Sequence, residues 1–160
     1  MQHRSHRVHY FEFTSPDELP APDQKLLEVA IQNLDTAHAP YSRFRVSAAA
    51  RLAGGQVILG ANFENAAYPM CLCAERTVLA SCFSQFPHER IDTLAVTVRS
   101  ANVLVDRPAS PCGACRQVIA EVEERQQHPI RVLLHGMTGP VWIFERGGDL
   151  LPFGFSGKLL

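Results

Sequence analysis

The sequence predicts an α/β protein, a three-layer α/β/α sandwich around a five-stranded mixed sheet. Segments with alternating apolar residues are interleaved with segments whose apolar residues recur at helical spacing, the order expected when helices cover both faces of a sheet. The chain has 160 residues, of which 46% are hydrophobic, and is therefore long enough to bury one core without disulfides. The order of the strands does not follow from the sequence.

The first 22 residues are expected to be an N-terminal extension of a single domain over residues 23–160. Residues 9–13 alternate weakly and form either a short edge strand or an ordered arm, and residues 15–22 are a turn-rich linker. Asp23 is interpreted as the N-cap of a helix that ends near Pro40, because proline disfavours a helical residue before it.

The middle of the chain alternates between predicted strands and helices. Residues 44–52 and 56–61 alternate on either side of Gly54-Gly55, which predicts a β-hairpin. A later strand is apolar on both faces from Leu94 to Val98 and is expected to be central. The remaining elements follow in order: loop 62–72, helix 73–86, strand 91–98, loop 101–111, helix 112–125, and strands 130–134 and 141–144.

Charge and composition argue against several classes of protein. The net charge is −1 with no basic stripe, which counts against binding of DNA or RNA. No apolar run is long enough for a membrane span, and no segment of signal-peptide type follows the first residues. Five cysteines, an odd number with metal-like spacing, suit a reducing cytoplasm better than a disulfide framework.

Three cysteines stand at two predicted helix starts, in Cys73-Ala74-Glu75-Arg76 and Pro111-Cys112-Gly113-Ala114-Cys115. Helix N-termini favour thiolates, and three thiolates on zinc leave a fourth position for water or substrate. The alternative is a closed, structural zinc site in which Cys71 is the fourth cysteine ligand. A structural site has no need of Glu75, whereas a carboxylate beside a zinc-bound water acts as general base and then general acid.

The two motifs resemble the zinc-dependent nucleoside and base deaminases, whose signature is Cys/His-x-Glu followed by Pro-Cys-x-x-Cys. Further segments narrow the resemblance to small, homotetrameric, three-cysteine cytidine deaminases, from about residue 23 to the C-terminus. These segments are Ala39-Pro40-Tyr41-Ser42-x-Phe44-x-Val46, Asn62-x-Glu64-Asn65-Ala66 and Pro111-Cys112-Gly113-x-Cys115-Arg116-Gln117-Val118.

The resemblance implies hydrolytic deamination of cytidine and 2′-deoxycytidine to uridine and 2′-deoxyuridine, with release of ammonia, in pyrimidine salvage. It implies a cytoplasmic homotetramer with one Zn²⁺ per subunit, bound by Cys73, Cys112 and Cys115. Glu75 would carry the protons. Arg76 would hydrogen-bond the thiolates and offset the net charge of −1 that three thiolates leave on the metal.

The resemblance also assigns substrate-binding residues. Asn62 and Glu64 would bind the ribose 3′-hydroxyl, Phe44 would lie against the pyrimidine, and the Ala74 N–H at its helix start would hold the base O2. The tail over residues 150–155 contains two Leu and two Phe, each worth roughly 1.5–3 kcal/mol when fully buried. It either folds back on its own subunit or, as in the resembled family, sends Phe155 (with Phe153 as the alternative) into a neighbouring subunit's site.

Two other functions stay open. A deaminase of another small compound, such as blasticidin S or a free base, should lack the Asn62 and Glu64 pair. A non-catalytic zinc protein would have no reason to keep Glu75. Two residues depart from the resembled family: Ser47 stands where that family usually has Gly, and Cys71 is not one of its usual positions.

Overall fold

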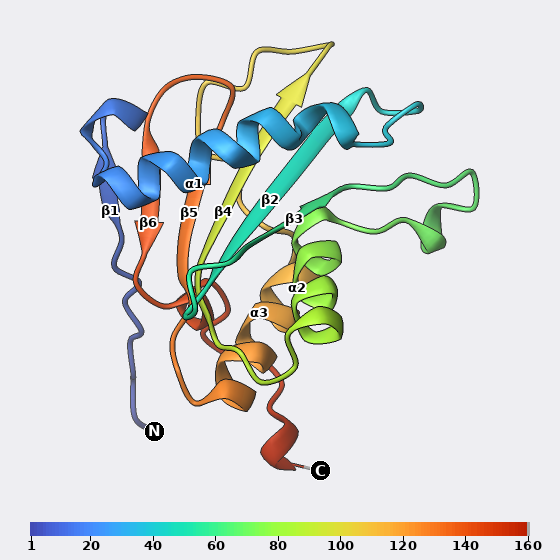
Figure 1. Cartoon of the computed structure of the whole chain (residues 1–160). Coiled ribbons are helices and arrows are strands. Elements are labelled where there is room, and N and C mark those ends of the chain that lie inside the picture. Colours follow the sequence, from blue (N-terminus) through green and yellow to red (C-terminus); the bar gives the residue numbers. More distant parts are fainter. Residues whose placement is uncertain (160) are drawn as a thin grey trace.

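The structure, a computed structural model, describes residues 1–159. Within these residues six strands form one sheet in the order β1-β6-β5-β4-β2-β3 (Figure 1). Strands β4 and β5 are parallel and the other neighbouring pairs are antiparallel, so the sheet is mixed, as predicted. The strands are β1 (Phe11–Phe13), β2 (Phe44–Leu52), β3 (Val57–Ala61), β4 (Ile91–Ser100), β5 (Arg131–His135) and β6 (Val141–Phe144).

Helices cover both faces of the sheet, which confirms the three-layer architecture (Figure 1). Helix α1 (Ala21–Gln32) packs on one face, and helices α2 (Ala74–Gln85) and α3 (Gly113–Gln126) pack on the other. Successive strand residues point to opposite faces. In β4, accordingly, Ala95 packs beneath α1, whereas Leu94 and Val96 belong to the core beneath α2 and α3. Strand β4 lies inside the sheet, as its apolar sequence predicts.

The sheet has six strands rather than five because residues of the N-terminal extension pair with β6. Phe11 lies opposite Ile143 and Phe13 opposite Val141, in antiparallel register. The Trp142 Nε1–H donates to Glu12 Oε2 at 2.6 Å, and this side-chain hydrogen bond links β6 to β1 in addition to the backbone pairing. The edge strand is therefore the correct one of the two interpretations of residues 9–13, and the domain boundary at residue 23 stays a prediction.

Helix α1 begins at Ala21, and the prediction that Asp23 is its N-cap is wrong. Pro20 is the N-cap and Pro22 lies in the first turn, where a missing N–H costs nothing. Asp23 is instead 3% exposed, and its carboxylate accepts hydrogen bonds from Arg51 at 3.3 Å and from Arg131. These ion pairs fasten α1 to β2 and β5. The α-helix also ends before Pro40, at Gln32, and continues as a 3₁₀ turn over Asn33–Thr36.

The first turn of α2 lies against β3 because of Gly60. A Cβ atom at this position would lie 2.6 Å from the Val78 nitrogen and 2.8 Å from the Ala74 oxygen, both in the α2 backbone. Only glycine permits so close an approach of a strand to a helix. Asn33 Nδ2 donates to the Gly60 oxygen at 3.3 Å and to the buried Ser47 hydroxyl at 3.0 Å. Ser47, one of the two departures from the resembled family, thus has a polar partner in the core.

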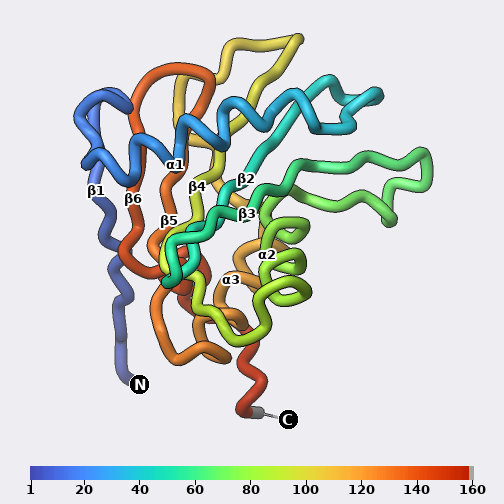
Figure 2. The backbone as a smooth tube through the Cα atoms, in the orientation of Figure 1, coloured from blue at the N-terminus to red at the C-terminus, as the bar shows by residue number. Residues whose placement is uncertain are grey.

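Two loops protrude together from the β3 edge of the sheet (Figure 2). The backbone of His38, which follows α1, bonds to Asn62 at 3.0 Å and to Glu64 at 2.8 Å, at the start of the loop between β3 and α2. The first residues and residues 157–159 lie at the same end of the molecule (Figures 1 and 2). No helix within residues 1–159 has the length and apolar character needed to cross a bilayer.

Candidate active site

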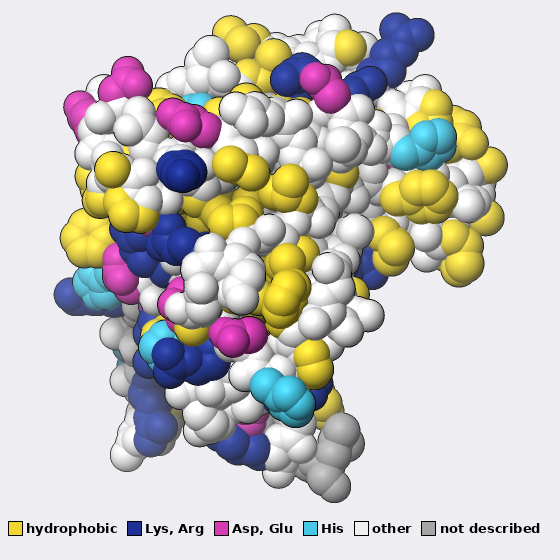
Figure 3. All heavy atoms as spheres, in the orientation of Figure 1, with side chains coloured by type: hydrophobic (Ala, Val, Ile, Leu, Met, Phe, Trp, Pro, Cys, Tyr) yellow, Lys and Arg dark blue, Asp and Glu magenta, His cyan; other side chains and the backbone are white. Residues whose placement is uncertain are grey.

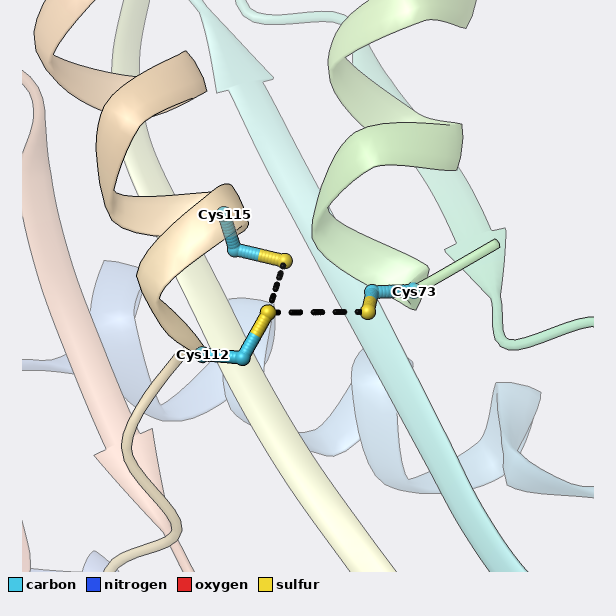
Figure 4. A group of neighbouring side chains, drawn as sticks. All are labelled: Cys73, Cys112 and Cys115. Atoms are coloured by element: carbon cyan, nitrogen blue, oxygen red, sulfur yellow. Dashed lines mark hydrogen bonds between the residues drawn. The ribbon is translucent and has the colours of Figure 1, made fainter. Parts of the chain in front are cut away.

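Two helix N-termini bring three sulfur atoms together (Figure 4). Cys73 is the N-cap residue of α2 and Cys112 the N-cap residue of α3, while Cys115 lies in the first turn of α3. The Cys73 and Cys112 sulfurs are 3.8 Å apart, the Cys112 and Cys115 sulfurs 3.4 Å, and all three lie within 4.8 Å of one another. The predicted helix starts are therefore correct to within one residue.

The spacing and chemistry of the three sulfurs fit zinc. With Zn–S bonds of about 2.3 Å, the sulfurs of a tetrahedral site lie roughly 3.8 Å apart. The hydrogen bond from the Cys115 thiol, followed by the effect of Arg76, lowers the pKa of Cys73 to about 5. The same hydrogen bond, together with burial, raises the pKa of Cys115. A divalent cation bound to the sulfurs favours the thiolate form of all three.

Cys71 is not part of this cluster. Among residues 1–159 the three sulfurs form a group without a fourth Cys, His or carboxylate ligand. The Cys71 sulfur instead accepts a hydrogen bond from the Asn65 N–H at 3.2 Å and lies 3.6 Å from the Asn65 oxygen. The alternative of a closed four-cysteine site is therefore wrong, and a fourth position remains for a small ligand.

Glu75 lies in the first turn of α2 with only 4% of its surface exposed. Burial raises the pKa of its carboxyl, and the negative charge of Cys73 acts in the same direction. A buried carboxyl of raised pKa in a cavity is typical of a group that takes part in acid–base chemistry. Glu75 therefore has the surroundings of a proton carrier rather than of a surface carboxylate.

Arg76 turns back towards the sulfurs from the next position of α2. Its Nη2 donates to the Cys71 carbonyl oxygen at 3.0 Å and lies 3.9 Å from the Cys73 sulfur. Its Nε is buried and has no hydrogen-bond partner within residues 1–159. Arg76 therefore places a cation beside the Cys73 sulfur, and its role in offsetting the charge of zinc-bound thiolates stays a prediction.

A cavity of about 300 Å³ opens beside the sulfurs, at the base of the loop between β3 and α2. Six of the predicted site residues line it, whereas Cys115 and Ala74 are fully buried behind it and Phe155 lies elsewhere. Apolar side chains of β2, β4 and the loops complete the wall. The lining residues are Phe44, Val46, Asn62, Phe63, Glu64, Cys71, Leu72, Cys73, Glu75, Val96, Val98, Ala109, Ser110 and Cys112.

The Asn62 and Glu64 side chains lie at the cavity wall and already bind the backbone. Asn62 Oδ1 accepts from the Val46 N–H at 2.8 Å, and Asn62 Nδ2 donates to the Phe44 oxygen at 3.0 Å. Glu64 accepts from the Ser42 hydroxyl and from the Tyr41 and Ser42 N–H groups. Burial acts to raise the pKa of Glu64, but these hydrogen bonds outweigh it and lower the pKa.

The tail does not bury its aromatic side chains on its own subunit. Phe155 is 58% exposed and Phe153 is 89% exposed. The Phe155 backbone is bound to Gln117 of α3, and the Phe153 ring lies 6.0 Å from the His6 ring. Folding back on the same subunit, the simpler interpretation of the sequence, therefore applies to the tail backbone and to Leu150 but not to the two rings.

Sequence reasoning missed the cavity residues that belong to no chemical motif. Phe63 and Leu72 lie in the loop read as irregular, and Ala109 and Ser110 precede the Pro111-Cys112 motif. Their nearness in sequence to Glu64, Cys73 and Cys112 was the only available signal. A larger cavity of about 600 Å³ lies between α3 and the chain termini, away from the sulfurs, and its wall mixes acidic and basic side chains.

Residues 20–127 match the family model described as the cytidine and deoxycytidylate deaminase zinc-binding region. A cytidine deaminase of Halalkalibacterium halodurans is 48% identical over 99 residues, which cover 62% of this chain and 70% of that protein. A cytidine deaminase of Mycobacterium tuberculosis is 38% identical over 130 residues, which cover 79% of this chain and 84% of that protein.

Solved structures of cytidine deaminases are also similar to this chain. The crystal structure of a cytidine deaminase from Burkholderia pseudomallei is 39% identical, with a TM-score of 0.70, and covers 82% of this chain and 97% of that chain. The structure of the Mycobacterium tuberculosis enzyme is 34% identical, with a TM-score of 0.62, and covers 82% of this chain and 94% of that chain.

Proposed function

The chain belongs to the cytidine and deoxycytidylate deaminase family, and on that premise we propose that it deaminates cytidine and 2′-deoxycytidine. Water and the nucleoside give uridine or 2′-deoxyuridine and ammonia. The observation that carries this proposal is the buried Glu75 carboxylate in the wall of a cavity that also contains the Cys73 and Cys112 sulfurs. A purely structural zinc site gives no reason to bury a carboxylate there.

Cys73, Cys112 and Cys115 would hold one zinc ion per subunit, in keeping with their spacing and with the zinc-binding region of the family. When bound, zinc supplies Lewis-acid chemistry that makes water nucleophilic near neutral pH. Arg76 offsets the excess negative charge of three thiolates through its contact with the Cys73 sulfur.

Glu75 carries the two protons that the reaction must move. Its carboxylate accepts the first proton as the water oxygen adds to C4 of the ring, and delivers that proton to N3. It then accepts the remaining hydroxyl proton and delivers it to the amine as the C4–N bond breaks, so that ammonia leaves. Burial supports this role, because it raises the pKa of Glu75 and so favours the protonated form that must deliver each proton.

Groups in the cavity wall, and one backbone N–H behind it, orient the nucleoside. Phe44 offers an aromatic face to the pyrimidine, and the Ala74 N–H, the first of α2 and so without a partner in its helix, offers a donor to the base O2. Asn62 Nδ2 keeps a second hydrogen and the Glu64 oxygens keep unused lone pairs. One ribose 3′-hydroxyl can therefore accept from Asn62 and donate to Glu64.

Glu64 also excludes larger substrates. Its lowered pKa keeps it ionised, so that it repels a 3′-phosphate and disfavours a polynucleotide. The relatives in Halalkalibacterium halodurans and Mycobacterium tuberculosis are named cytidine deaminases, and the pair formed by Asn62 and Glu64 supports a nucleoside rather than blasticidin S or a free base. The proposed location is the cytoplasm, supported by five cysteines without a disulfide among them.

We further propose that the enzyme is a homotetramer and that Phe155 enters a neighbouring subunit's cavity. Hydrophobic side chains gather over the protruding loops beside the cavity (Figure 3). The exposed apolar residues of these loops are Tyr41, Phe63, Tyr68, Met70 and Leu72. An exposed patch of this kind is typical of a protein–protein interface. The exposed Phe155 ring, which its own subunit leaves in solvent, supports the same arrangement.

Ammonia release tests the activity. The purified protein, its zinc content measured, is assayed with cytidine, 2′-deoxycytidine, cytosine, cytidine monophosphate, blasticidin S and single-stranded DNA. The two nucleosides should be deaminated and the others should react at least 100-fold more slowly. Equal activity on cytosine or blasticidin S would contradict the substrate class, and the absence of any turnover would favour a non-catalytic zinc protein. Light scattering should give the mass of four subunits.

A further inference from the structure

The Gln117 side chain holds the backbone of the tail at Phe155, the residue whose aromatic ring is exposed. Gln117 Nε2 donates to the Phe155 carbonyl oxygen at 2.8 Å, and the Phe155 N–H donates to Gln117 Oε1 at 3.0 Å. The side-chain amide thus pairs with the Phe155 peptide groups as a neighbouring strand would. Two parallel constraints fix the backbone orientation of Phe155, and with it the direction of its Cα–Cβ bond.

Helix α3 holds the tail on either side of this point as well. Arg116 Nη1 donates to the Leu150 oxygen at 3.1 Å, before the tail turns outward. Glu124, seven residues after Gln117 and therefore on the same side of the helix, accepts from the Ser156 hydroxyl at 2.8 Å and pairs with Lys158 at 3.3 Å. The tail is therefore docked at several points along α3 rather than hanging free.

The contacts are made by the backbone and polar groups of the tail, and the aromatic ring is left out of them. Phe155 is 58% exposed as a residue although its peptide groups are fixed. A backbone fixed to display a large apolar side chain to solvent makes sense when another surface receives that side chain. Fixing it in advance removes part of the ordering cost of binding.

We propose that Gln117 is a positioning residue for substrate binding: its amide pre-orders Phe155 so that the ring reaches the nucleoside cavity of the adjoining subunit. The inference rests on the proposed function for the destination of Phe155. It adds a residue that touches neither the substrate nor the metal. Gln117 follows Cys115 by two positions, so the helix that supplies two sulfurs to its own site also aims the ring at the next one.

The first test separates kcat from KM. Replacing Gln117 with Ala should raise KM for cytidine by roughly 5- to 30-fold, the factor expected when one or two ordered residues become free, and leave kcat within about twofold. Zinc content should stay at one ion per chain. Arg125→Ala, a change in an exposed residue of the same helix whose side chain lies over the Phe83 ring and not against the tail, is the matched control and should leave KM unchanged. A loss of zinc or of kcat in Gln117→Ala would instead assign Gln117 to the metal site and overturn the proposal.

A double-mutant cycle tests whether Gln117 acts through Phe155. Phe155→Ala should raise KM at least as much as Gln117→Ala, and the double variant should be no worse than Phe155→Ala alone. Gln117→Glu keeps the acceptor but loses the donor, and should fall between wild type and Gln117→Ala. If the two KM effects multiplied in the double variant, Gln117 would act independently of the ring and the proposal would be wrong.

Mixed oligomers separate this inference from the proposed function. Glu75→Gln subunits co-purified with Phe155→Ala subunits should regain activity with near wild-type KM, because each chain supplies what the other lacks. Placing Gln117→Ala on the Glu75→Gln chain should raise that KM again. If the first mixture kept the raised KM of Phe155→Ala, the assignment of Phe155 to a neighbouring site would fail, and this inference with it. If both mixtures shared one KM, only the role of Gln117 would fail.

Discussion

At the scale of single residues, chemistry in this site depends on a carboxylate that the fold keeps away from water. Glu75 is 4% exposed and faces a cavity shared with two sulfurs, so its environment differs from that of the exposed Glu89 in the loop after α2. Burial raises the pKa of Glu75, and this shift separates a proton carrier from an ordinary surface group.

Glu75→Gln should reduce kcat by roughly 100- to 10,000-fold, the usual contribution of a positioned acid–base group. Zinc should stay bound, because the amide is similar in shape and no sulfur is removed. Metal analysis and steady-state kinetics check both points, with Glu89→Gln as the control that keeps full activity. Near wild-type turnover in Glu75→Gln would refute the proton-carrier role.

Arg76→Gln should leave the thiolates without their cation. We expect kcat to fall about tenfold, the acidic limb of the pH–rate profile to move to higher pH, and metal retention to weaken. The contacts that would be lost are those of Nη2 with the Cys71 oxygen and the Cys73 sulfur. Arg90→Gln, at an exposed position, is the control. An unchanged profile with full zinc content would make Arg76 an ordinary helix arginine.

The buried His135 should make the free energy of unfolding decrease as the pH falls. Its side chain is 3% exposed, and burial lowers its pKa below the usual 6.5 because the charged ring is poorly solvated there. Its contribution to stability is fully present above pH 6.5 and is lost as the pH falls through 6.5 towards the lowered value. Lowering the pH from 7.5 to 5.5 should therefore reduce the free energy of unfolding of wild type more than that of His135→Gln, as measured by urea unfolding. The exposed His88→Gln should behave as wild type, and an equal loss in all three would exclude His135 as the cause.

At the scale of elements, the site depends on how closely α2 can approach the sheet. The N-terminus of α2 carries Cys73 and Glu75, and the absence of a side chain at Gly60 allows the helix to lie against β3. Helix α3 supplies the other two sulfurs. A small shift of either helix therefore changes the distance between Cys73 and its partners.

Gly60→Ala should displace α2, because the added Cβ would lie 2.6 Å from a backbone nitrogen that cannot rotate away. We expect a loss of roughly 1–3 kcal/mol in the free energy of unfolding, the usual cost of overpacking, and a weaker affinity for zinc. Urea unfolding and a competitive zinc chelator measure the two effects.

Gly113→Ala is the matched control for Gly60→Ala. It lies between two sulfur ligands, yet a Cβ there meets no atom within 4 Å, and alanine favours the helix. Its stability and zinc affinity should therefore stay close to wild type. If Gly113→Ala weakened zinc binding and Gly60→Ala did not, the close packing of α2 on β3 would not control the site.

At the scale of the whole molecule, the sulfur cluster joins helices that otherwise meet mainly through the sheet. Removing zinc with a chelator should lower the thermal midpoint, because a ligand that binds only the folded state stabilises it by mass action. Restoring zinc should reverse the shift. Cys112→Ser should remove most of the response, whereas Cys82→Ser, at a buried cysteine outside the cluster, should lower the midpoint yet keep the response to zinc. An identical midpoint with and without zinc would contradict a metal that links α2 and α3.

The sequence by itself determined the local elements and the chemical groups of the site. Residues 44–52 form a strand and Cys73 begins a helix because apolar periodicity and terminal residues are properties of neighbouring positions. The three-sulfur set was also predictable, since each motif lies within a few residues and zinc accepts thiolates at helix starts.

Only the tertiary structure decided which distant residues meet. Asp23 was read as a cap because its partners, Arg51 and Arg131, lie 28 and 108 residues away in the chain. The sixth strand, the close packing at Gly60 and the pairing of Gln117 with Phe155 are likewise contacts between remote segments. Such contacts depend on how elements pack against one another. The apolar periodicity of one segment does not specify which remote segment lies beside it.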